Sequence, residues 1–304
     1  MTITVTIPYA AQHERLKRAR PDVQWHLWHP AEPPVVAEAD LVVLPYMEAA
    51  TSLEGLPKIK TGVVQAPSLG VDGMQEMVPN GAVLCNAKGV HEAPTAELGL
   101  ALILAAQRKV PAMVQSQSQR QWEQFFAPSL ISRSVLIFGA GGVANELAKR
   151  LIASDAKVLR AARSARTDEY GEILESSDAR ARLGEFDIVV LVVPLNEQTT
   201  HLADASFFAA MRDDALLVNI ARGPVVETNA LVDALNSGRI RAVLDVTDPE
   251  PLPSEHPLWS APGLLISPHL GGRVDHLDAS LDALILDQVE RIESGRELWA
   301  VVES

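Results

Sequence analysis

The chain has 304 residues, more than a single domain usually contains, so two domains are expected. Hydrophobic residues make up 47% and charged residues 21% of the sequence, which is ordinary for a globular protein. The net charge of -13 disfavours non-specific binding to nucleic acid or to an anionic membrane, because phosphate groups would repel the protein. The single cysteine, Cys85, excludes an internal disulfide and a cysteine-based zinc site.

The N-terminus predicts a cytoplasmic protein. Residues 1–7 alternate apolar and polar side chains, whereas a signal peptide has a charged start followed by an apolar run. No apolar run in the sequence is long enough for a membrane-spanning helix. A lone cysteine also suits a reducing compartment.

The first third of the chain alternates short apolar runs with turn residues. A helix is expected over residues 10–20, closed by Pro21. Short strands are expected at residues 2–7, 23–28, 41–45, 61–65 and 82–85. This succession of short strands, a helix and turn residues predicts a small α/β unit with a parallel sheet. The loop 67–73 then lies at the carboxyl end of a strand, where open α/β sheets bind ligands.

A long apolar helix is expected next, over residues 98–110 and ending before Pro111. Pro94 and the acidic Glu97 suit the beginning of that helix. Residues 115–124 then predict a second, solvated helix. The long helix is expected to mark the first domain boundary.

The stretch 135–144 combines a buried strand, a glycine-rich turn and the start of a helix. Gly139 and Gly141, with the small Ala144, match the pattern of a dinucleotide cradle. The glycines in such a cradle let the backbone approach a pyrophosphate, whose charge faces the N–H groups and the dipole of the helix. An ordinary glycine-rich turn is the alternative, but the flanking strand and helix favour a nicotinamide dinucleotide site.

Five strands are expected after the cradle, at residues 157–164, 186–194, 215–220, 242–246 and 264–266. The run at residues 186–194 is almost continuously apolar, and the last three strands repeat this pattern, which is typical of a parallel sheet covered by helices on both faces. A helix is expected over residues 229–235, and a last helix over residues 275–293 could return to the first domain. The chain is therefore predicted to have an α/β, doubly wound fold.

The residues after the second strand of this sheet indicate which dinucleotide binds. An NAD-binding fold places a carboxylate about 20 residues beyond the glycines to bind the ribose diol, whereas this chain has Ala162 and Arg163. Arg163, Ser164 and Arg166 predict a site for a 2′-phosphate, so NADP(H) is expected to be preferred and NAD(H) remains possible. The alternative is that these arginines and Arg160 form only a solvated basic edge.

Three polar residues, Arg222, Glu250 and His269, follow three successive predicted strands. Taken singly they also fit a surface ion pair, a loop charge and a core histidine. Hydride transfer to a ketone leaves negative charge on oxygen, so the reaction needs a proton donor and a cation. A hydrogen-bonded carboxylate favours the imidazolium form of histidine, which makes His269 beside Glu250 the candidate donor. The guanidinium of Arg222 can bind a carboxylate and polarise the adjacent carbonyl.

Several segments resemble motifs of the D-isomer-specific 2-hydroxyacid dehydrogenase family. They are residues 69–72, 95–97, 193–200, 217–226, 244–253, 256–259 and 266–272. The resemblance covers nearly the whole chain. Glyoxylate/hydroxypyruvate reductases are the closer likeness, because they too can place arginine after the second strand.

The resemblance implies two Rossmann-like, doubly wound parallel-sheet domains. The substrate domain would be discontinuous, residues 1–93 and 275–304, and the dinucleotide-binding domain, residues 94–274, would be inserted into it. The resemblance also implies that Arg222, Glu250 and His269 are catalytic. The backbone amides of Leu69 and Gly70, together with Arg222, would bind the substrate carboxylate.

The resemblance further implies Asp245 near the nicotinamide carboxamide and a homodimer formed through the cofactor domain. The full set of expected cofactor-binding residues is Thr95, Gly139, Gly141, Gly142, Val143, Arg163, Ser164, Arg166, Pro194, Thr199, Ile220, Ala221, Asp245 and Gly271. No metal site is expected, because the sequence has neither a His-Glu-x-x-His motif nor a cysteine cluster.

The predicted activity is NADP(H)-dependent reduction of a small 2-oxo acid, glyoxylate or hydroxypyruvate. Two alternatives stay open: an NAD-dependent dehydrogenase of a larger 2-hydroxy acid, and a non-catalytic, nucleotide-sensing scaffold like the corepressors with this fold. A short-chain dehydrogenase is excluded because no tyrosine is followed by a lysine four residues later. The shape of the substrate pocket is expected to depend on Tyr46, Met47, Trp122 and Trp259.

Overall fold

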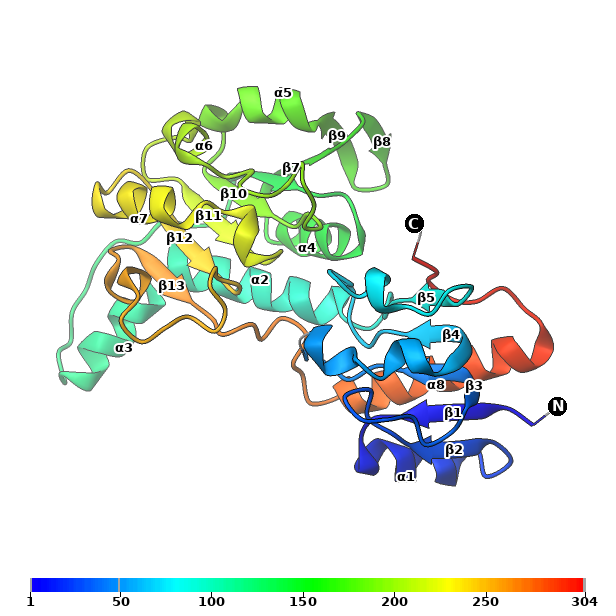
Figure 1. The fold of residues 1–304 in the computed structure, drawn as a ribbon. Coiled ribbons are helices and arrows are strands. Elements are labelled where there is room, and N and C mark those ends of the chain that lie inside the picture. Colours follow the sequence, from blue (N-terminus) through cyan, green and yellow to red (C-terminus); the bar gives the residue numbers. More distant parts are fainter. Residues whose placement is uncertain (1, 49, 303–304) are drawn as a thin grey trace. The chain divides into compact units, whose positions relative to one another are not determined.

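The structure is a computed structural model that describes residues 2–48 and 50–302, and it divides into two compact units (Figure 1). The first unit comprises residues 1–91 and 274–304, and the second comprises residues 92–273. The second unit is thus inserted into the sequence of the first. The sequence analysis placed these divisions at 93/94 and 274/275.

The first unit is built on a five-stranded parallel sheet with the order β2-β1-β3-β4-β5. Its strands are β1 (Thr4–Ile7), β2 (Gln24–Leu27), β3 (Glu38–Val43), β4 (Lys60–Gln65) and β5 (Val83–Cys85). Its helices are α1 (Ala10–Ala19) and α8 (Leu277–Ser294), and α8 comes from the C-terminal stretch of the chain. Ile285 and Val289 of α8 are buried in one hydrophobic cluster with Val5 and Ile7 of β1, so burial of apolar surface joins the two stretches of this unit.

The second unit is built on an eight-stranded sheet with the order β13-β12-β11-β10-β6-β7-β9-β8, parallel except for the β8–β9 hairpin. Its strands are β6 (Ser134–Phe138), β7 (Lys157–Ala162), β8 (Arg166–Asp168), β9 (Gly171–Glu175), β10 (Ile188–Leu191), β11 (Leu216–Asn219), β12 (Arg241–Leu244) and β13 (Leu264–Ile266). Strand order reverses beside β6, the first strand of this sheet in the chain. This is the doubly wound topology in which nucleotides bind at the reversal point.

Helices cover both faces of the second sheet. They are α2 (Glu92–Gln107), α4 (Gly142–Ala153), α5 (Ser176–Ala181), α6 (Ala205–Ala210) and α7 (Thr228–Asn236). Helix α3 (Val110–Ser118) belongs to the same unit but has no buried residue. Ile103 of α2 and Leu147 of α4 lie in one core cluster, and Phe207 of α6 and Leu231 of α7 lie in another. Every residue of β10 is buried, as a strand between two helical layers requires, and the predicted α/β, doubly wound fold is confirmed.

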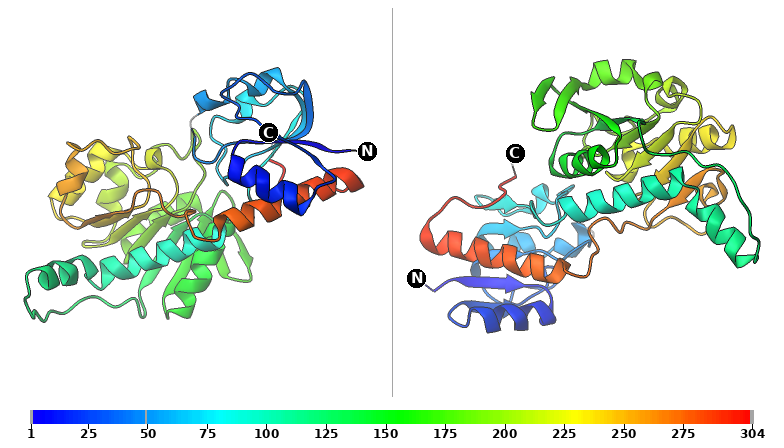
Figure 2. Two further views of the ribbon diagram at one scale, coloured as in Figure 1. Left: turned by 90° about the horizontal axis from the view of Figure 1, so that it is seen from below. Right: turned by 180° about the vertical axis from the view of Figure 1, so that it is seen from behind.

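The segment after α2 differs from its prediction. Helix α2 ends at Gln107, and Lys109 adopts a left-handed conformation with φ 56°. Pro111 then lies in the first turn of α3, where a missing N–H costs nothing, so it begins a helix instead of ending one. Helix α3 ends at Ser118, and the extended segment that follows leads back to β6 (Figure 2). The prediction of a helix over residues 115–124 was therefore wrong beyond Ser118.

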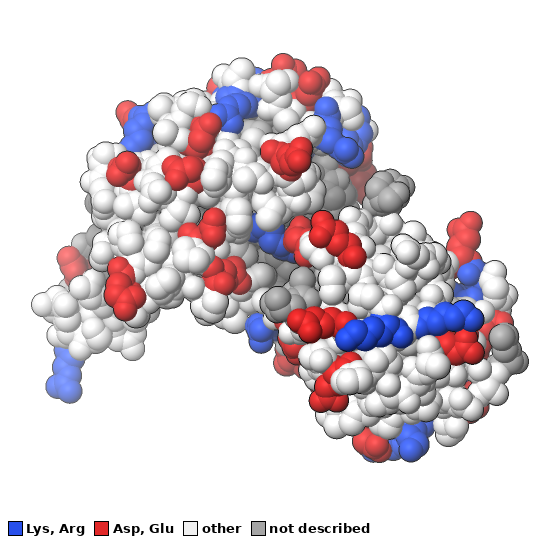
Figure 3. Space-filling model, in the orientation of Figure 1, with Lys and Arg blue, Asp and Glu red and all other residues white. Residues whose placement is uncertain are grey.

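Acidic and basic side chains are interspersed over the face drawn in Figure 3, in agreement with a net charge that is negative but distributed. Within residues 2–48 and 50–302, no helix is both long and apolar enough to cross a membrane.

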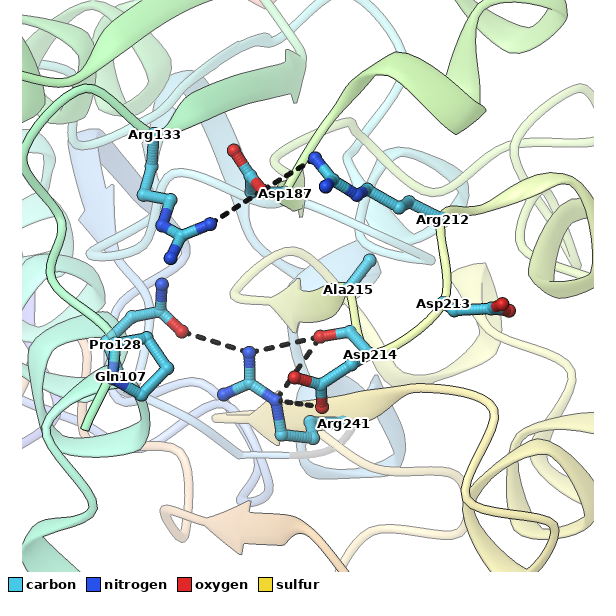
Figure 4. A pocket seen from close by; sticks show the side chains of 9 residues that line it. All are labelled: Gln107, Pro128, Arg133, Asp187, Arg212, Asp213, Asp214, Ala215 and Arg241. Atoms are coloured by element: carbon cyan, nitrogen blue, oxygen red, sulfur yellow. Dashed lines mark hydrogen bonds and ion pairs between the residues drawn. The ribbon is translucent and has the colours of Figure 1, made fainter. Parts of the chain in front are cut away.

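A hollow at the amino ends of the strands of the second sheet is lined by balanced charges (Figure 4). Asp187 accepts hydrogen bonds from Arg133 at 3.0 Å and from Arg212 at 3.1 Å. Arg241 donates to Asp214 at 2.9 Å and to the side chain of Gln107 at 3.0 Å. Because each arginine that lines the hollow is paired with a carboxylate, we interpret this network as structural. It ties the loops at the edge of the sheet opposite the predicted site.

Candidate active site

The turn between β6 and α4 requires glycine at its first position. Gly139 has a φ of 135°, and a Cβ atom there would lie 2.3 Å from the carbonyl oxygen of Val192. Its N–H donates to the carbonyl of Ala161 at 2.8 Å, which holds the turn against the end of β7. Ala144, the small residue one turn into α4, is fully buried in the core below the helix. The turn and the helix therefore pack as a dinucleotide cradle does.

The N-terminus of α4 has room for an anion. No side chain caps this helix, and a Cβ atom on Gly141 would meet nothing within 4 Å. Gly142 is covered on another side by the side chain of Glu92, whose Cγ would lie 2.5 Å from an added Cβ. The first N–H groups of α4 have no N-cap side chain, and the small residues at this turn, with the half-buried Val143, fit the close approach of a pyrophosphate.

The basic residues within and after β7 fall into two groups. Arg163, Ser164 and Arg166 are exposed, and within the described chain neither of these two arginines forms an ion pair. Arg160 differs, because its side chain is only 1% exposed and is paired with Asp168. Arg160 also donates to Asn145 of α4 at 2.7 Å. The interpretation of Arg160 as part of a solvated basic edge was therefore wrong.

Arg160 also explains the β8–β9 hairpin, which the sequence analysis missed. Its guanidinium lies 5.4 Å from the ring centroid of Tyr170, in the turn between these two strands. Asp168 at the end of β8 accepts hydrogen bonds from Arg160 and from the backbone N–H of Tyr170. Arg166 is the first residue of β8. The buried guanidinium of Arg160 therefore fixes the hairpin that carries Arg166.

His269 and Glu250 form a close pair. The Nδ1 atom of His269 lies 2.5 Å from Oε1 of Glu250. Burial raises the pKa of Glu250, but the hydrogen bond and charge of His269, with smaller contributions from Thr247 and Arg222, lower that pKa further, below its ordinary value. Glu250 is thus a carboxylate at neutral pH. Within the described residues the Nε2 atom of His269 has no hydrogen-bond partner, which leaves it available to a substrate.

The backbone of His269 is held in a conformation that non-glycine residues rarely adopt, with φ 55°. Its N–H donates to the carbonyl of Asp245 at 2.8 Å. The carboxylate of Asp245 is buried and accepts hydrogen bonds from the Ser267 hydroxyl at 2.6 Å and from the N–H groups of Leu270 and Gly271 at 2.9 and 3.0 Å. Asp245 therefore determines the shape of the loop that presents His269, a role that the sequence analysis did not assign to it.

Arg222 follows β11 and is half-buried. Its charge contributes to the low pKa of Glu250, which places the two groups in one electrostatic environment. The side chain of Asn219 donates to the carbonyl of Arg222 at 2.9 Å and accepts from the N–H of Ala221 at 3.0 Å. A Cβ atom on Gly223 would lie 1.9 Å from the carbonyl of Thr247, so glycine lets the loops after β11 and β12 touch. Asn219 and Gly223 are positioning residues that sequence reasoning missed.

The structure brings together three other predicted cofactor residues. A Cβ atom on Gly271 would lie 3.1 Å from Oδ2 of Asp245 and 3.2 Å from the hydroxyl of Thr95. Thr199 uses its hydroxyl within its own turn, donating to the carbonyl of Pro194 at 2.6 Å.

Ile220 and Ala221 are buried, and the side chain of Ile220 packs against Gly99 of α2. At these two positions the backbone is the part that can reach a ligand. The predicted roles of all these residues toward a cofactor stay predictions.

Leu69 and Gly70 lie in the first unit, in the loop after β4, and both are half-buried. Within the described residues their N–H groups have no hydrogen-bond acceptor. Two consecutive loop N–H groups without an acceptor in the protein are available to an anion. Their availability suits the predicted binding of a carboxylate.

The model of the D-isomer specific 2-hydroxyacid dehydrogenase NAD binding domain matches residues 100–271, which is more than half of the chain. The chain belongs to this family. A glyoxylate reductase of Thermofilum pendens is 34% identical over 232 residues, which cover 73% of this chain and 68% of that protein.

Two solved structures show the same fold. A D-isomer specific 2-hydroxyacid dehydrogenase family protein from Aeromonas salmonicida, 26% identical, superposes with a TM-score of 0.88 over 100% of this chain and 99% of the other. An NADPH-dependent glyoxylate/hydroxypyruvate reductase from Sinorhizobium meliloti, in complex with NADP and sulfate, is 23% identical and has a TM-score of 0.84 over 100% and 98% of the two chains. With this membership, the chain is an NAD(P)-dependent oxidoreductase of 2-hydroxy and 2-oxo acids.

Proposed function

We propose that this protein is an NADP(H)-dependent reductase of small 2-oxo acids, with glyoxylate or hydroxypyruvate as substrate. The observation that carries the proposal is the pair of His269 and Glu250 beside the charge of Arg222, at the carboxyl edge of a sheet that also presents a dinucleotide cradle. This set provides an acid, a cation and a cofactor site in one unit.

In this proposal each residue of the set has a separate task. NADPH, when bound at the cradle, would supply a hydride to the carbonyl carbon of the substrate. His269 donates a proton from Nε2 to the carbonyl oxygen, and the carboxylate of Glu250 stabilises the imidazolium before that transfer. Arg222 binds the substrate carboxylate and stabilises the negative charge that develops on the carbonyl oxygen. The left-handed backbone of His269, fixed through Asp245, holds the proton donor in place.

The preference for NADP(H) is supported by the residues after β7. Position 162 is alanine, so no carboxylate there repels a 2′-phosphate. Arg163 and Arg166 are exposed, and neither is neutralised by an ion pair in the described chain. A guanidinium–phosphate contact is worth about 1.5 to 3 kcal/mol, which is roughly ten- to a hundredfold in affinity.

The preference for a small, unphosphorylated substrate is supported by charges in the first unit. Glu48 accepts a hydrogen bond from the Tyr9 hydroxyl at 3.2 Å and lies 3.2 Å from the ring of His29, in the loop after β3. Lys60 is paired with Glu38 at 3.0 Å. Within the described residues these contacts leave no unpaired cation for a substrate phosphate at Glu48 or Lys60, and Lys60 would contribute little because it is already paired.

A homodimer formed through the second unit is also part of the proposal. The extended segment after α3 exposes Trp122 by 94% and Phe126 by 100%, and Met113 and Val114 of α3 are exposed as well. Contiguous exposed apolar patches of this kind mark protein interaction sites. Helix α3 and the segment after it project from the rest of the second unit (Figure 2). We expect a second copy of the chain to cover the apolar side chains that they expose.

The test is a panel of 2-oxo acids assayed with NADPH and with NADH by the loss of nicotinamide absorbance. The proposal expects glyoxylate or hydroxypyruvate with NADPH to give the highest kcat/KM, and 3-phosphohydroxypyruvate to be poor. A preference for NADH with a larger 2-oxo acid would favour the alternative dehydrogenase. Binding of dinucleotide without turnover of any substrate would favour the sensing scaffold.

A further inference from the structure

The loop Pro67–Gly70 is held so that its carbonyl groups all have donors. The bonds run from Nε2 of His91 to Pro67 at 2.7 Å, from the N–H of Ala87 to Ser68 at 2.9 Å, from the side chain of Asn86 to Leu69 at 3.1 Å, and from the Ser68 hydroxyl to Gly70 at 2.7 Å. Because the carbonyls of the loop are satisfied by the protein, the peptide planes at Leu69 and Gly70 are oriented. Their N–H groups are thereby left for a ligand.

His91 makes the first of these bonds and is buried, with 5% of its surface exposed. A carbonyl oxygen only accepts hydrogen bonds, so the Nε2 atom of His91 carries a proton. The ring of His91 also stacks on the ring of Tyr46, with the centroids 5.6 Å apart and the planes 2° from parallel. Tyr46 is in the loop after β3, and its N–H donates to the Tyr9 hydroxyl at 2.9 Å.

The imidazole therefore links two loops at the carboxyl edge of the first sheet. It donates to the loop after β4 and stacks on the loop after β3. The catalytic step assigned to His269 does not use it. A buried histidine in this position anchors the start of the loop that carries the Leu69 and Gly70 amides.

We propose that His91 is a positioning residue for the substrate carboxylate. Its Nε2 proton holds the carbonyl of Pro67 and so anchors the start of the loop that carries the Leu69 and Gly70 amides, while Ala87 and Asn86 hold the carbonyls of Ser68 and Leu69 that share peptide planes with those amides. The stacked ring of His91 keeps Tyr46 beside this loop. The inference rests on the proposed function to the extent that the carboxylate belongs to a 2-oxo acid. It predicts that His91 affects binding of the acid and leaves binding of the dinucleotide unchanged.

The experiment compares His91→Phe, which keeps a ring to stack on Tyr46 but removes the donor, with His91→Gln, whose side-chain amide can replace the Nε2 donor. The matched control is His13→Phe. His13 is in the same unit and its Nε2 atom lies 3.2 Å from the carbonyl of Trp25, so this variant removes a similar contact away from the loop. The probe is oxamate, a carboxylate with an adjacent carbonyl that is not reduced, titrated by calorimetry into the protein saturated with NADPH.

We expect His91→Phe to weaken oxamate binding and to raise KM for glyoxylate about tenfold, the effect of roughly one lost hydrogen bond. KM for NADPH should stay within about twofold of the wild type. His91→Gln should recover most of the oxamate affinity, and His13→Phe should bind oxamate as the wild type does. Thermal unfolding of all three variants separates a general loss of stability from a loss confined to this site.

Unchanged oxamate affinity in His91→Phe would overturn the inference, and so would an equal loss of affinity for oxamate and NADPH. A wild-type protein that binds no oxamate would overturn it as well, because the loop would then hold no carboxylate. A wild-type protein that binds oxamate but reduces no 2-oxo acid would refute the proposed function. In that case the oxamate titrations of the variants would still decide the role of His91.

Discussion

At the scale of single residues, the chemistry depends on how a few side chains are held. The Nδ1 atom of His269 is bonded to Glu250, and the backbone conformation of His269 is fixed through Asp245. Its second ring nitrogen, Nε2, is therefore the one available to a substrate. Glu250 is ionised at neutral pH, because the groups around it keep its pKa low in spite of burial. Arg163 and Arg160 are three residues apart, but one is exposed and the other is buried in an ion pair.

The first prediction concerns Glu250→Gln. Loss of the carboxylate removes the anion that favours the imidazolium of His269. The decline of kcat/KM for ketone reduction with rising pH should therefore begin at a lower pH than in the wild type. The pH profile of kcat/KM for glyoxylate measures this shift. His269→Gln is the reference variant, and it should lose most turnover, at least about a hundredfold, while it still binds NADPH. A Glu250→Gln profile that coincides with that of the wild type would refute the assigned pairing.

The second prediction concerns the choice of cofactor. Arg163→Ala combined with Ala162→Asp removes a cation from the proposed phosphate site and supplies a carboxylate for the ribose diol. The ratio of kcat/KM for NADPH to that for NADH should fall by at least about tenfold, as expected when one charge-assisted contact is lost. Steady-state kinetics with both cofactors measure the ratio. Lys157→Ala, at the other end of β7, is the control and should keep the wild-type ratio.

At the scale of elements, short-range packing and ion pairs determine where strands and helices end. The turn before helix α4 needs Gly139, because a side chain there would clash with the carbonyl of Val192. Helix α8 ends at Ser294 and is followed by Gly295, which has a φ of 65°. The hairpin of β8 and β9 is too short to bury a core of its own and depends on Arg160. The loops at the amino ends of β6, β10 and β11 depend in the same way on Asp187, which accepts from Arg133 and Arg212.

The third prediction concerns Asp187 and acid stability. Burial raises the pKa of Asp187, but its hydrogen bonds with Ser134 and Arg133 outweigh that effect and hold the pKa below the ordinary value of 3.8. The unfolded state therefore binds more protons than the folded state as the pH falls from that value to the lowered pKa. Asp187 thus stabilises the fold above this window and loses its contribution within it.

Asp187→Asn should accordingly lower the free energy of unfolding by about 2 kcal/mol at neutral pH, because two arginines lose an anionic partner. The difference from the wild type should shrink as the pH falls through the window. Urea unfolding at a series of pH values measures both effects. Asp214→Asn, whose side chain is 73% exposed beside Arg241, should have a much smaller effect. An equal loss at every pH would show that Asp187 acts through packing and not through its charge.

At the scale of the whole molecule, the main open surface is the apolar patch of α3 and the segment that follows. A monomer would leave Trp122 and Phe126 in water, whereas burial of a large apolar side chain is worth about 1.5 to 3 kcal/mol. This surface belongs to the second unit.

The fourth prediction tests this association. Light scattering should give the mass of a dimer for the wild type, and a mass close to the 32.8 kDa of one chain for the double variant Trp122→Ser, Phe126→Ser. The control is Trp259→Ser, which removes another exposed tryptophan, 53% exposed, and should leave the dimer intact. A wild-type protein that is monomeric at micromolar concentration would refute the proposed interface.

The sequence by itself determined the class of fold, the cradle and the order of the motifs. Buried parallel strands are continuous apolar runs, and the cradle at Gly139 is a local device of a strand, a glycine and a helix N-terminus, so both can be read from neighbouring residues. The position of polar residues after strands also predicted that Arg222, Glu250 and His269 belong together, because carboxyl ends of parallel strands share one edge of the sheet.

Only the tertiary structure decided which polar groups are engaged with the protein and which are left for a ligand. Arg160 and Arg163 look alike in sequence, but Arg160 is buried because Asp168 and Tyr170 fold back over it. His91 carried no sequence signal, since its partners Pro67 and Tyr46 lie 24 and 45 residues away. The physical reason is that hydrogen bonds and ion pairs of this kind form between segments distant in the chain, and their geometry exists only once the strands have assembled.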